Sequence, residues 1–303
     1  MLLDKKLPFR YIFKDIYPSL GWVLLMSAVF QLLKQFFLSY LPVLPLQLAT
    51  VLGGGISLLL AFNISQSYDR WWEARKVWGA IINDSRSLVL QAQGFLAGEV
   101  LPAPGPAAAL QALAYRQIAW CYSLGQALRG LDGAAGLAPF LAEPEQVYLQ
   151  AHANKPLALL ALHTSQLRAL RRQGALDTFQ HVQMDATLVR LCDAQGRAER
   201  IRNTVFPTSY RLLIHFFIYL FLGTLSLSLV ETVGDWEVPL LLTIAATYFL
   251  LERTARYLQD PFSNRPTDTP VTSIARTVEI NLKQLLGETD APGPLPAEGY
   301  YLP

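Results

Sequence analysis

Three residues of one apolar stretch, Gly54, Leu58 and Phe62, are spaced four residues apart, so a helix places them on nearly one stripe. A single stripe of this kind can simply pack against another apolar helix. Several copies around a symmetry axis would instead stack into rings, and a narrow apolar ring gates ions because nothing replaces their hydration shell. The partly positive ring edge of Phe62 would favour anions. Asn63 and Gln66, on the next turn, would rehydrate an ion that leaves the constriction.

No pattern in the chain supports catalysis. The four histidines form no HExxH pattern or ligand cluster, and the two cysteines, Cys121 and Cys192, form no CxxC pattern. GxSxG, Walker A and GxGxxG patterns are also absent. The run Gly53-Gly54-Gly55 lies among apolar residues, where small side chains let helix backbones approach each other. We therefore predict no catalytic residue, no metal site and no cofactor, and we expect His152 and His163 to be exposed on helices.

The composition indicates a membrane protein. Hydrophobic residues make up 52% of the 303 residues and charged residues only 16%, whereas soluble domains usually carry about 25% charge. A net charge of +2 without a basic run gives no support for a nucleic-acid partner. Four apolar runs can cross a lipid bilayer, the last by including its flanks, and they cover residues 18–40, 46–66, 212–230 and 238–251.

The second apolar run continues into a polar segment without a break. No charged residue occurs between Lys34 and Asp69, and neither Gly nor Pro occurs between Ser67 and Trp78. We therefore predict one continuous helix that leaves the membrane near Tyr68. Amphipathic aromatic rings settle at the level of the lipid headgroups. The point where the helix leaves the membrane is therefore marked by Tyr68, Trp71, Trp72 and Trp78.

Basic residues lie on one side of the predicted spans. They precede the first and third runs and follow the second and fourth, whereas the turns at 41–45 and 231–237 have none. The positive-inside rule then places both termini and the long middle segment in the cytosol. The outer turn at 231–237 is acidic through Glu231, Asp235 and Glu237, and it would attract cations if it faced a pore entrance. Lys34 is predicted to snorkel outward to the far interface, beside a belt of Phe36, Phe37 and Tyr40.

The predicted organisation is an all-α membrane protein with four parts. Residues 1–69 hold the first two spans, 70–204 a large cytosolic helical region, 205–258 the last two spans, and 259–303 a final helix and tail. Within the cytosolic region the periodicity predicts helices at 72–94, 107–128, 156–172 and 177–202, with loops at 101–106 and 130–144. An amphipathic helix at 271–286 precedes a Pro/Gly-rich tail that lies over other surfaces or is mobile.

The stretch Ser67-Tyr68-Asp69-Arg70-Trp71-Trp72-Glu73-Ala74-Arg75-Lys76, followed by Asn83-Asp84-Ser85-Arg86, closely resembles the bestrophin family in its bacterial branch. Further blocks in family order are Glu199-Arg200-Ile201, Phe206-Pro207, Asp260-Pro261-Phe262 and Arg276-Thr277-Val278-Glu279. The family motif proper is Asp69, Arg70, Trp71 and Trp72. These blocks extend over most of the chain.

The resemblance implies a homopentameric ion channel of the bacterial inner membrane, with one central pore lined by the second span and continued through a cytosolic vestibule. The three neck positions of the family fall on Gly54, Leu58 and Phe62. Gly54 departs from the bulky residue expected there, which implies a wider outer end of the neck. A second, cytosolic aperture falls on Val182 by a gapless count. The alternative for Val182 is packing in the core of its helix.

Animal bestrophins follow the Pro-Phe pair with an acidic run that binds calcium. Here Pro261-Phe262 is followed by Ser263-Asn264-Arg265-Pro266-Thr267-Asp268. One carboxylate does not supply the 6–8 oxygen ligands that calcium prefers. We therefore predict that no calcium clasp of the animal type forms.

Three functional hypotheses follow. The first is a passive channel for inorganic ions, gated by apolar rings, with chloride or another anion favoured on family grounds and a cation-selective bacterial bestrophin as the alternative. The second, of another class, is a membrane-anchored helical scaffold that binds partners. A carrier is disfavoured because its broken helices and internal repeats are not evident.

Overall fold

The structure is a computed structural model of the chain, and it describes residues 2, 13, 14, 16–37, 44–96, 105–229 and 233–302. Over this described part the fold is all-helical, with only isolated bridges of extended backbone such as that between Leu2 and Tyr301. The helices are α2 (Tyr17–Phe37), α3 (Leu46–Leu96), α4 (Gly105–Leu128), α5 (Glu143–Gln150), α6 (Lys155–Arg172), α7 (Thr178–Asn203), α8 (Thr208–Ser228), α9 (Glu237–Gln259) and α10 (Val271–Leu285). Two short 3-10 helices, η2 (Ala138–Phe140) and η3 (Gly234–Trp236), lie between them.

The chain divides into two compact units. Unit 1 comprises Met1–Asp4, Trp72–Thr204 and Pro261–Pro303, and unit 2 comprises Lys5–Trp71 and Val205–Asp260. Four helices of the described chain are long and apolar enough to cross a membrane, namely α2, α3, α8 and α9. The predicted all-α membrane fold with four apolar helices is therefore confirmed.

Helix α3 is a single helix of 51 residues. Its first part belongs to unit 2 and its second part, from Trp72, to unit 1. The continuous helix predicted from the absence of Gly and Pro after Ser67 is confirmed. Trp78, however, is fully buried in the core of unit 1, so its predicted place at the membrane surface is wrong. Tyr68 and Trp72 are each about half exposed.

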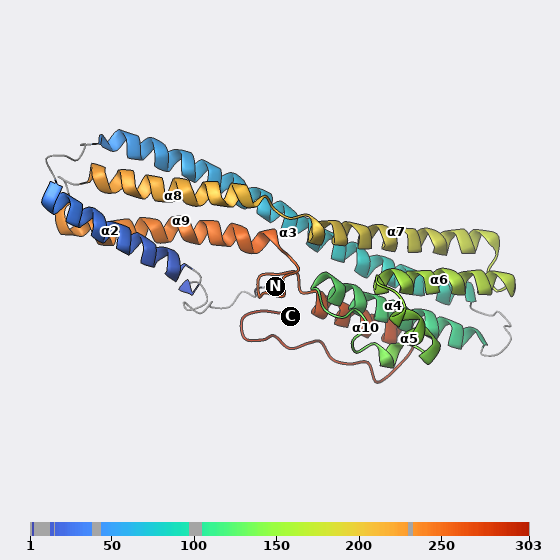
Figure 1. Cartoon of the computed structure of the whole chain (residues 1–303). Helices are drawn as coiled ribbons and strands as arrows, with labels where there is room; N and C mark the ends of the chain where they lie inside the picture. The colour runs from blue at the N-terminus through green and yellow to red at the C-terminus, as the bar shows by residue number, and fades with distance from the viewer. Residues whose placement is uncertain are drawn as a thin grey trace. The chain divides into compact units, whose positions relative to one another are not determined.

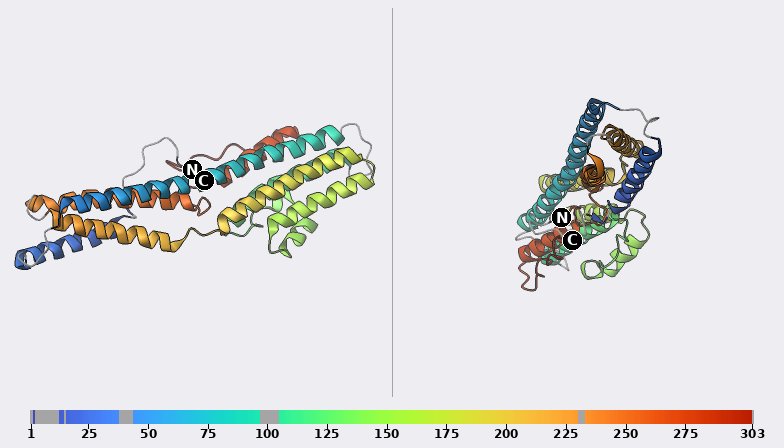
Figure 2. Two further views of the ribbon diagram at one scale, coloured as in Figure 1. Left: turned by 90° about the horizontal axis from the view of Figure 1, so that it is seen from above. Right: turned by 90° about the vertical axis from the view of Figure 1, so that its left-hand side faces the viewer.

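Unit 2 is a bundle of α2, α8, α9 and the first part of α3 (Figures 1 and 2). Its core is formed by apolar side chains from all four helices, among them Val23, Leu60, Leu222 and Phe249. Many apolar side chains on the outer surfaces of the same helices are exposed. This is the distribution expected of helices surrounded by lipid, since lipid tails are as apolar as the side chains themselves.

An ion pair lies within unit 2 at the end of the helices opposite to Tyr68. The Lys34 ammonium of α2 is 2.7 Å from Glu237 Oε1 of α9 and donates to the Ser226 carbonyl oxygen of α8 at 2.8 Å. Both charged side chains are nearly buried. The prediction that Lys34 snorkels outward is therefore wrong, because the Glu237 carboxylate neutralises the ammonium inside the bundle and the Ser226 carbonyl accepts a hydrogen bond from it. Phe36 and Phe37 are exposed as expected of a belt, and Tyr40 lies outside the described residues.

Unit 1 contains α4 to α7, α10 and the second part of α3. Helix α4 packs against α6 and α10, and α6 packs against α5 and α7. The core is large and includes Trp78, Trp120 and Met184. Helix α5 was not predicted, because Glu143-Pro144 was interpreted as the end of a loop. Proline instead stands in the first turn of the helix, where its missing N–H costs no hydrogen bond.

Candidate functional site

The predicted neck residues lie on the face of α3 that the bundle of unit 2 leaves uncovered. Leu58 is 58% exposed and Phe62 is 56% exposed. A Cβ atom built at Gly54 meets nothing within 4 Å. The alternative interpretation, in which this stripe packs against the third apolar helix, therefore does not hold within one chain.

A different face of α3 makes that packing. Ile56 and Leu60 are buried in the core of unit 2. A Cβ atom at Gly53 would stand 3.0 Å from Cε2 of Phe221 on α8. Of the three consecutive glycines, Gly53 therefore allows the close approach of α3 to α8, as predicted from its small side chain. Gly55, like Gly54, faces open space.

Hydrogen bonds fix the rotation of α3 within unit 2. The Tyr248 hydroxyl of α9 donates to the Gly53 carbonyl at 3.2 Å and lies 3.1 Å from Ser57 Oγ. About three turns further along both helices, the Gln259 amide of α9 donates to Asn63 Oδ1 at 3.1 Å and to Ser67 Oγ at 3.2 Å. These contacts direct the stripe of Leu58 and Phe62 away from the bundle.

The two polar residues predicted to rehydrate an ion lie on different faces. Asn63 is buried and bound to Gln259, so its predicted contact with an ion path is wrong. Gln66 is exposed and follows Phe62 by four residues on the same stripe. The exposed stripe of α3 therefore consists of Gly54, Leu58, Phe62 and Gln66, in this order along the helix.

The family motif lies at the end of this part of α3. Asp69 is exposed, Arg70 and Trp71 are half-buried, and the rings of Tyr68 and Trp71 are 6.0 Å apart between centroids. Arg70 interacts electrostatically with Asp260 of the Asp-Pro-Phe block. Two sequence blocks that are about 190 residues apart therefore meet in unit 2.

The predicted aperture residue Val182 lies on the exposed face of α7, 59% exposed. Phe179 and Val189 flank it and are exposed as well, whereas Met184 and Leu188 of the same helix point into the core of unit 1. Packing in the core, the alternative for Val182, is therefore wrong. The Asp177 side chain starts α7 by accepting from the Gln180 N–H in a capping box.

Asp268 is the one carboxylate of the segment Ser263–Asp268, for which the sequence predicted no calcium clasp. It is buried in unit 1, and its Oδ2 accepts from the backbone N–H of Arg265 at 3.1 Å. Burial raises the pKa of this carboxyl to about 6. This single carboxyl is buried against its own backbone, and one carboxylate does not supply the 6–8 oxygen ligands that calcium prefers. In the described part of the chain no three His, Cys, Asp or Glu residues gather into a potential metal site.

His163 of α6 is fully buried in unit 1, so the prediction that it is exposed is wrong. Burial, and secondly the positive charge of Arg116, lower the pKa of His163 well below its usual value. The neutral imidazole is thus a core residue. The guanidinium of Arg116 is bound by Glu145 and Gln166.

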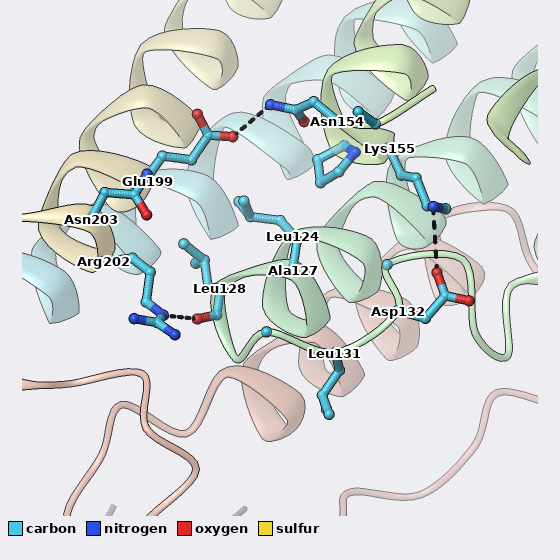
Figure 3. Close-up of a pocket in the computed structure, with 14 residues that line it drawn as sticks. Leu124, Ala127, Leu128, Leu131, Asp132, Asn154, Lys155, Glu199, Arg202 and Asn203 are labelled. Carbon is cyan, nitrogen blue, oxygen red and sulfur yellow. Dashed lines mark hydrogen bonds and ion pairs between the residues drawn. The ribbon is translucent and has the colours of Figure 1, made fainter. Parts of the chain in front are cut away.

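A hollow of about 540 Å³ in unit 1 is lined by apolar side chains, among them Leu124 and Leu128, and by charged ones (Figure 3). The charged side chains have partners within the hollow. Glu199 accepts from the Asn154 amide at 3.0 Å, Lys155 lies 3.6 Å from Asp132, and Arg202 Nε donates to the Leu128 carbonyl at 2.7 Å. The hollow therefore offers little net charge to a ligand.

Comparison with known proteins places this geometry in a family. Residues 10–284 match the sequence model of the bacterial/fungal bestrophin protein. The chain is 31% identical over 288 residues to the voltage-dependent anion channel-forming protein mll4386 of Mesorhizobium japonicum, covering 94% of this chain and 89% of that protein. It is 28% identical to the voltage-dependent anion channel-forming protein YneE of Escherichia coli K12, covering 83% and 80%.

Solved structures agree with the sequence matches. The crystal structure of a bacterial bestrophin homologue from Klebsiella pneumoniae superposes with a TM-score of 0.82 at 28% identity, covering 90% of this chain and 99% of that one. A variant of that homologue, with one isoleucine replaced by threonine, superposes with a TM-score of 0.81 at 27% identity, covering 90% and 100%. The fold, the ordered motif blocks and these matches together show that the chain belongs to the bestrophin family.

Proposed function

We propose that this chain forms a homopentameric channel through which anions pass passively, along an axis lined by the stripe of Gly54, Leu58 and Phe62. Bestrophins are ion channels and not enzymes. The relatives from Mesorhizobium japonicum and Escherichia coli are both named as anion channel-forming proteins. The basic residues beside the apolar helices support an inner-membrane orientation with both termini in the cytosol.

The observation that carries the proposal is the exposure of Leu58 and Phe62 on the face of α3 that the bundle leaves open. A face turned to lipid would be apolar throughout, because polar groups are costly there. This stripe instead passes from an open glycine to the exposed amide of Gln66. Such a stripe is suited to line a water path with a narrow apolar neck, from which water is readily expelled.

Anions are favoured over cations by two features. The ring edge of Phe62 carries partial positive charge. The acidic outer turn, the main argument for cations, loses Glu237 to the ion pair with Lys34. Glu231 and the side chain of Asp235 lie outside the described residues.

Val182 is proposed as a second constriction in unit 1. Its exposed apolar side chain, flanked by Phe179, offers the surface that an axial ring of five copies requires. The wider neck expected at Gly54 leaves Leu58 and Phe62 as the principal rings in unit 2.

The test is ion flux through liposomes that contain the purified protein, together with the mass of the particle. Leu58→Ala and Phe62→Ala should each raise chloride flux severalfold, because a wider ring wets more readily. Phe216→Ala is the matched control, since Phe216 on α8 is exposed to nearly the same extent, 60%, but lies off the stripe. Its flux should equal that of the unchanged protein.

Each alternative has its own outcome. Absence of flux in all proteins would favour the scaffold hypothesis, and unchanged flux in both neck variants would mean that the stripe faces lipid or a neighbouring subunit. A reversal potential across a salt gradient separates anions from cations. A particle mass that differs from five copies would contradict the pentamer.

Calcium should leave the flux unchanged. The carboxyl of Asp268 is buried and accepts from the Arg265 backbone, so it is not presented to a calcium ion as an open ligand. Flux measured with calcium and then with a chelator checks this expectation. A current that rises clearly on adding calcium would contradict it.

A further inference from the structure

A second hollow in unit 1, of about 500 Å³, is lined by Thr164, Arg168, Arg171 and Arg172 of α6 and by His181 of α7. We propose that this hollow binds a small multivalent oxyanion, of the kind carried by a phosphate or pyrophosphate group. The site belongs to unit 1 alone and does not depend on the channel proposed above.

The spacing along α6 places these side chains together. Thr164, Arg168 and Arg172 follow each other at four-residue intervals, and Arg171 lies three residues after Arg168, so all four lie on one side of the helix. His181 enters from the first turns of α7, which packs beside α6 (Figure 1). Three guanidinium groups and an imidazole therefore converge on one hollow.

The charge of this cluster is not neutralised by its own helix. Helix α6 contains no acidic residue between Lys155 and Arg172. The next acid in the chain, Asp177, accepts from the backbone of Gln180 in the capping box of α7. Among the described residues no ion pair joins Arg168, Arg171 or Arg172 to a carboxylate.

The hollow of Figure 3 provides a comparison within the same unit. There Lys155 lies beside Asp132, and Arg202 donates to a carbonyl. The guanidinium groups of the second hollow form no such contact with a described residue and remain available as donors. Planar guanidinium groups pair with phosphate oxygens through two parallel hydrogen bonds, which makes a phosphate-type anion the best match.

A structural role explains only part of the cluster. Arg171 and Arg172 stand in the last turn of α6, where positive charge stabilises a helix C-terminus. Arg168 lies one turn earlier, and this effect fades beyond the last turn. Anion binding accounts for all three.

The experiment titrates inorganic pyrophosphate into the full-length protein in a non-ionic detergent, followed by calorimetry. Binding should saturate below about 1 mM and weaken as salt is added. The double variant Arg168→Gln, Arg171→Gln should bind about tenfold more weakly or worse, because each lost charge-assisted bond weakens binding by roughly that factor. The control Arg197→Gln removes one charge from an exposed site on α7 outside the hollow and should bind within about twofold of the original.

Thermal unfolding in the same samples distinguishes binding from helix stabilisation. Pyrophosphate should raise the melting temperature of the original protein and of the Arg197→Gln variant, but not that of the double variant. A double variant that is less stable yet gains as much from pyrophosphate would overturn the proposal. So would an original protein that shows no saturable binding, or a control that loses as much affinity as the double variant.

The source of the phosphate group is tested by competition. A water-soluble short-chain phosphatidic acid, whose phosphomonoester is multivalent like the proposed ligand, is added to protein saturated with pyrophosphate. Displacement would assign the site to a lipid headgroup, and retention of pyrophosphate would assign it to a free phosphate compound. Either result supports a phosphate site in this hollow.

Discussion

The two faces of α3 within unit 2 are almost equally apolar, yet they have opposite environments. One face carries Ile56 and Leu60 into the bundle, and the other leaves Leu58 and Phe62 more than half exposed. In water such a difference would follow from hydrophobicity. In a membrane it cannot, because lipid accepts an apolar side chain as readily as a protein core does.

Steric fit and hydrogen bonds distinguish the two faces instead. Gly53 lets the helix approach Phe221, and the Tyr248 hydroxyl binds the Gly53 carbonyl. Gln259 holds Asn63 and Ser67 at the other end of the same face. Within the described part of the chain, Leu58 and Phe62 on the exposed face have no comparable anchors, so this face can line a path or meet another copy.

The largest expected difference concerns two neighbouring leucines. Leu60→Ala should lower the free energy of unfolding by about 2 kcal/mol, the cost of the cavity left in a packed core. Leu58→Ala should change it by less than about 0.5 kcal/mol within one chain, as is usual for exposed positions. Thermal unfolding of the purified protein in detergent measures both.

The comparison of the leucines also tests the assembly. If Leu58→Ala destabilised the protein as much as Leu60→Ala, Leu58 would be packed against a neighbouring subunit, and its proposed place on the axis would be lost. A flux increase confined to Leu58→Ala would sharpen the distinction between the two faces.

A smaller difference is expected between adjacent glycines. Gly53→Ala places a Cβ atom 3.0 Å from the Phe221 ring and should destabilise unit 2 by about 1 kcal/mol, because the ring must shift. Gly54→Ala meets nothing within 4 Å and should stabilise the helix by about 0.5–1 kcal/mol. Each variant is the control for the other in the same unfolding measurement. Equal effects of the two substitutions would contradict the assigned rotation of α3.

The smallest effect is expected at the hydroxyl that anchors α3. Tyr248→Phe removes the bonds to Gly53 and Ser57 and should cost about 0.6 kcal/mol, the average for hydrogen bonds between membrane helices. Tyr17→Phe, at an exposed position of α2, is the control and should cost nothing measurable. A loss no larger than that of the control would mean that the Tyr248 hydroxyl does not help to orient α3.

Much of the helical framework was predictable because its signals are local. The apolar runs, the unbroken passage from Ser67 to Trp78 and the start of α7 at Asp177 are properties of neighbouring residues. Helix α5 was missed because a proline beside a glutamate is typical of both a turn and a helix start.

The candidate site was predictable in part. The four-residue spacing and the motif that follows it identified Leu58 and Phe62 as one stripe. Spacing alone did not separate that stripe from the face of Leu60, and it placed Asn63 beside the stripe, although Gln259 binds Asn63 within the bundle.

Contacts between distant segments lay beyond any local pattern. The partner of Lys34 is Glu237, about 200 residues away, and only the meeting of α2 with α9 brings the ammonium and the carboxylate together. His163 was likewise predicted to be exposed, but the packing of α4 against α6 buries it.

By itself, the sequence determined that this is a helical membrane protein with four apolar helices, one of them extended, and with the motif blocks of its family. Only the tertiary structure decided which face of α3 is covered and which charges are neutralised. The physical reason is that the helical period shows which residues share a face of a helix but not which face is buried. In a membrane, steric fit and hydrogen bonds with helices far away in the chain decide which face is buried.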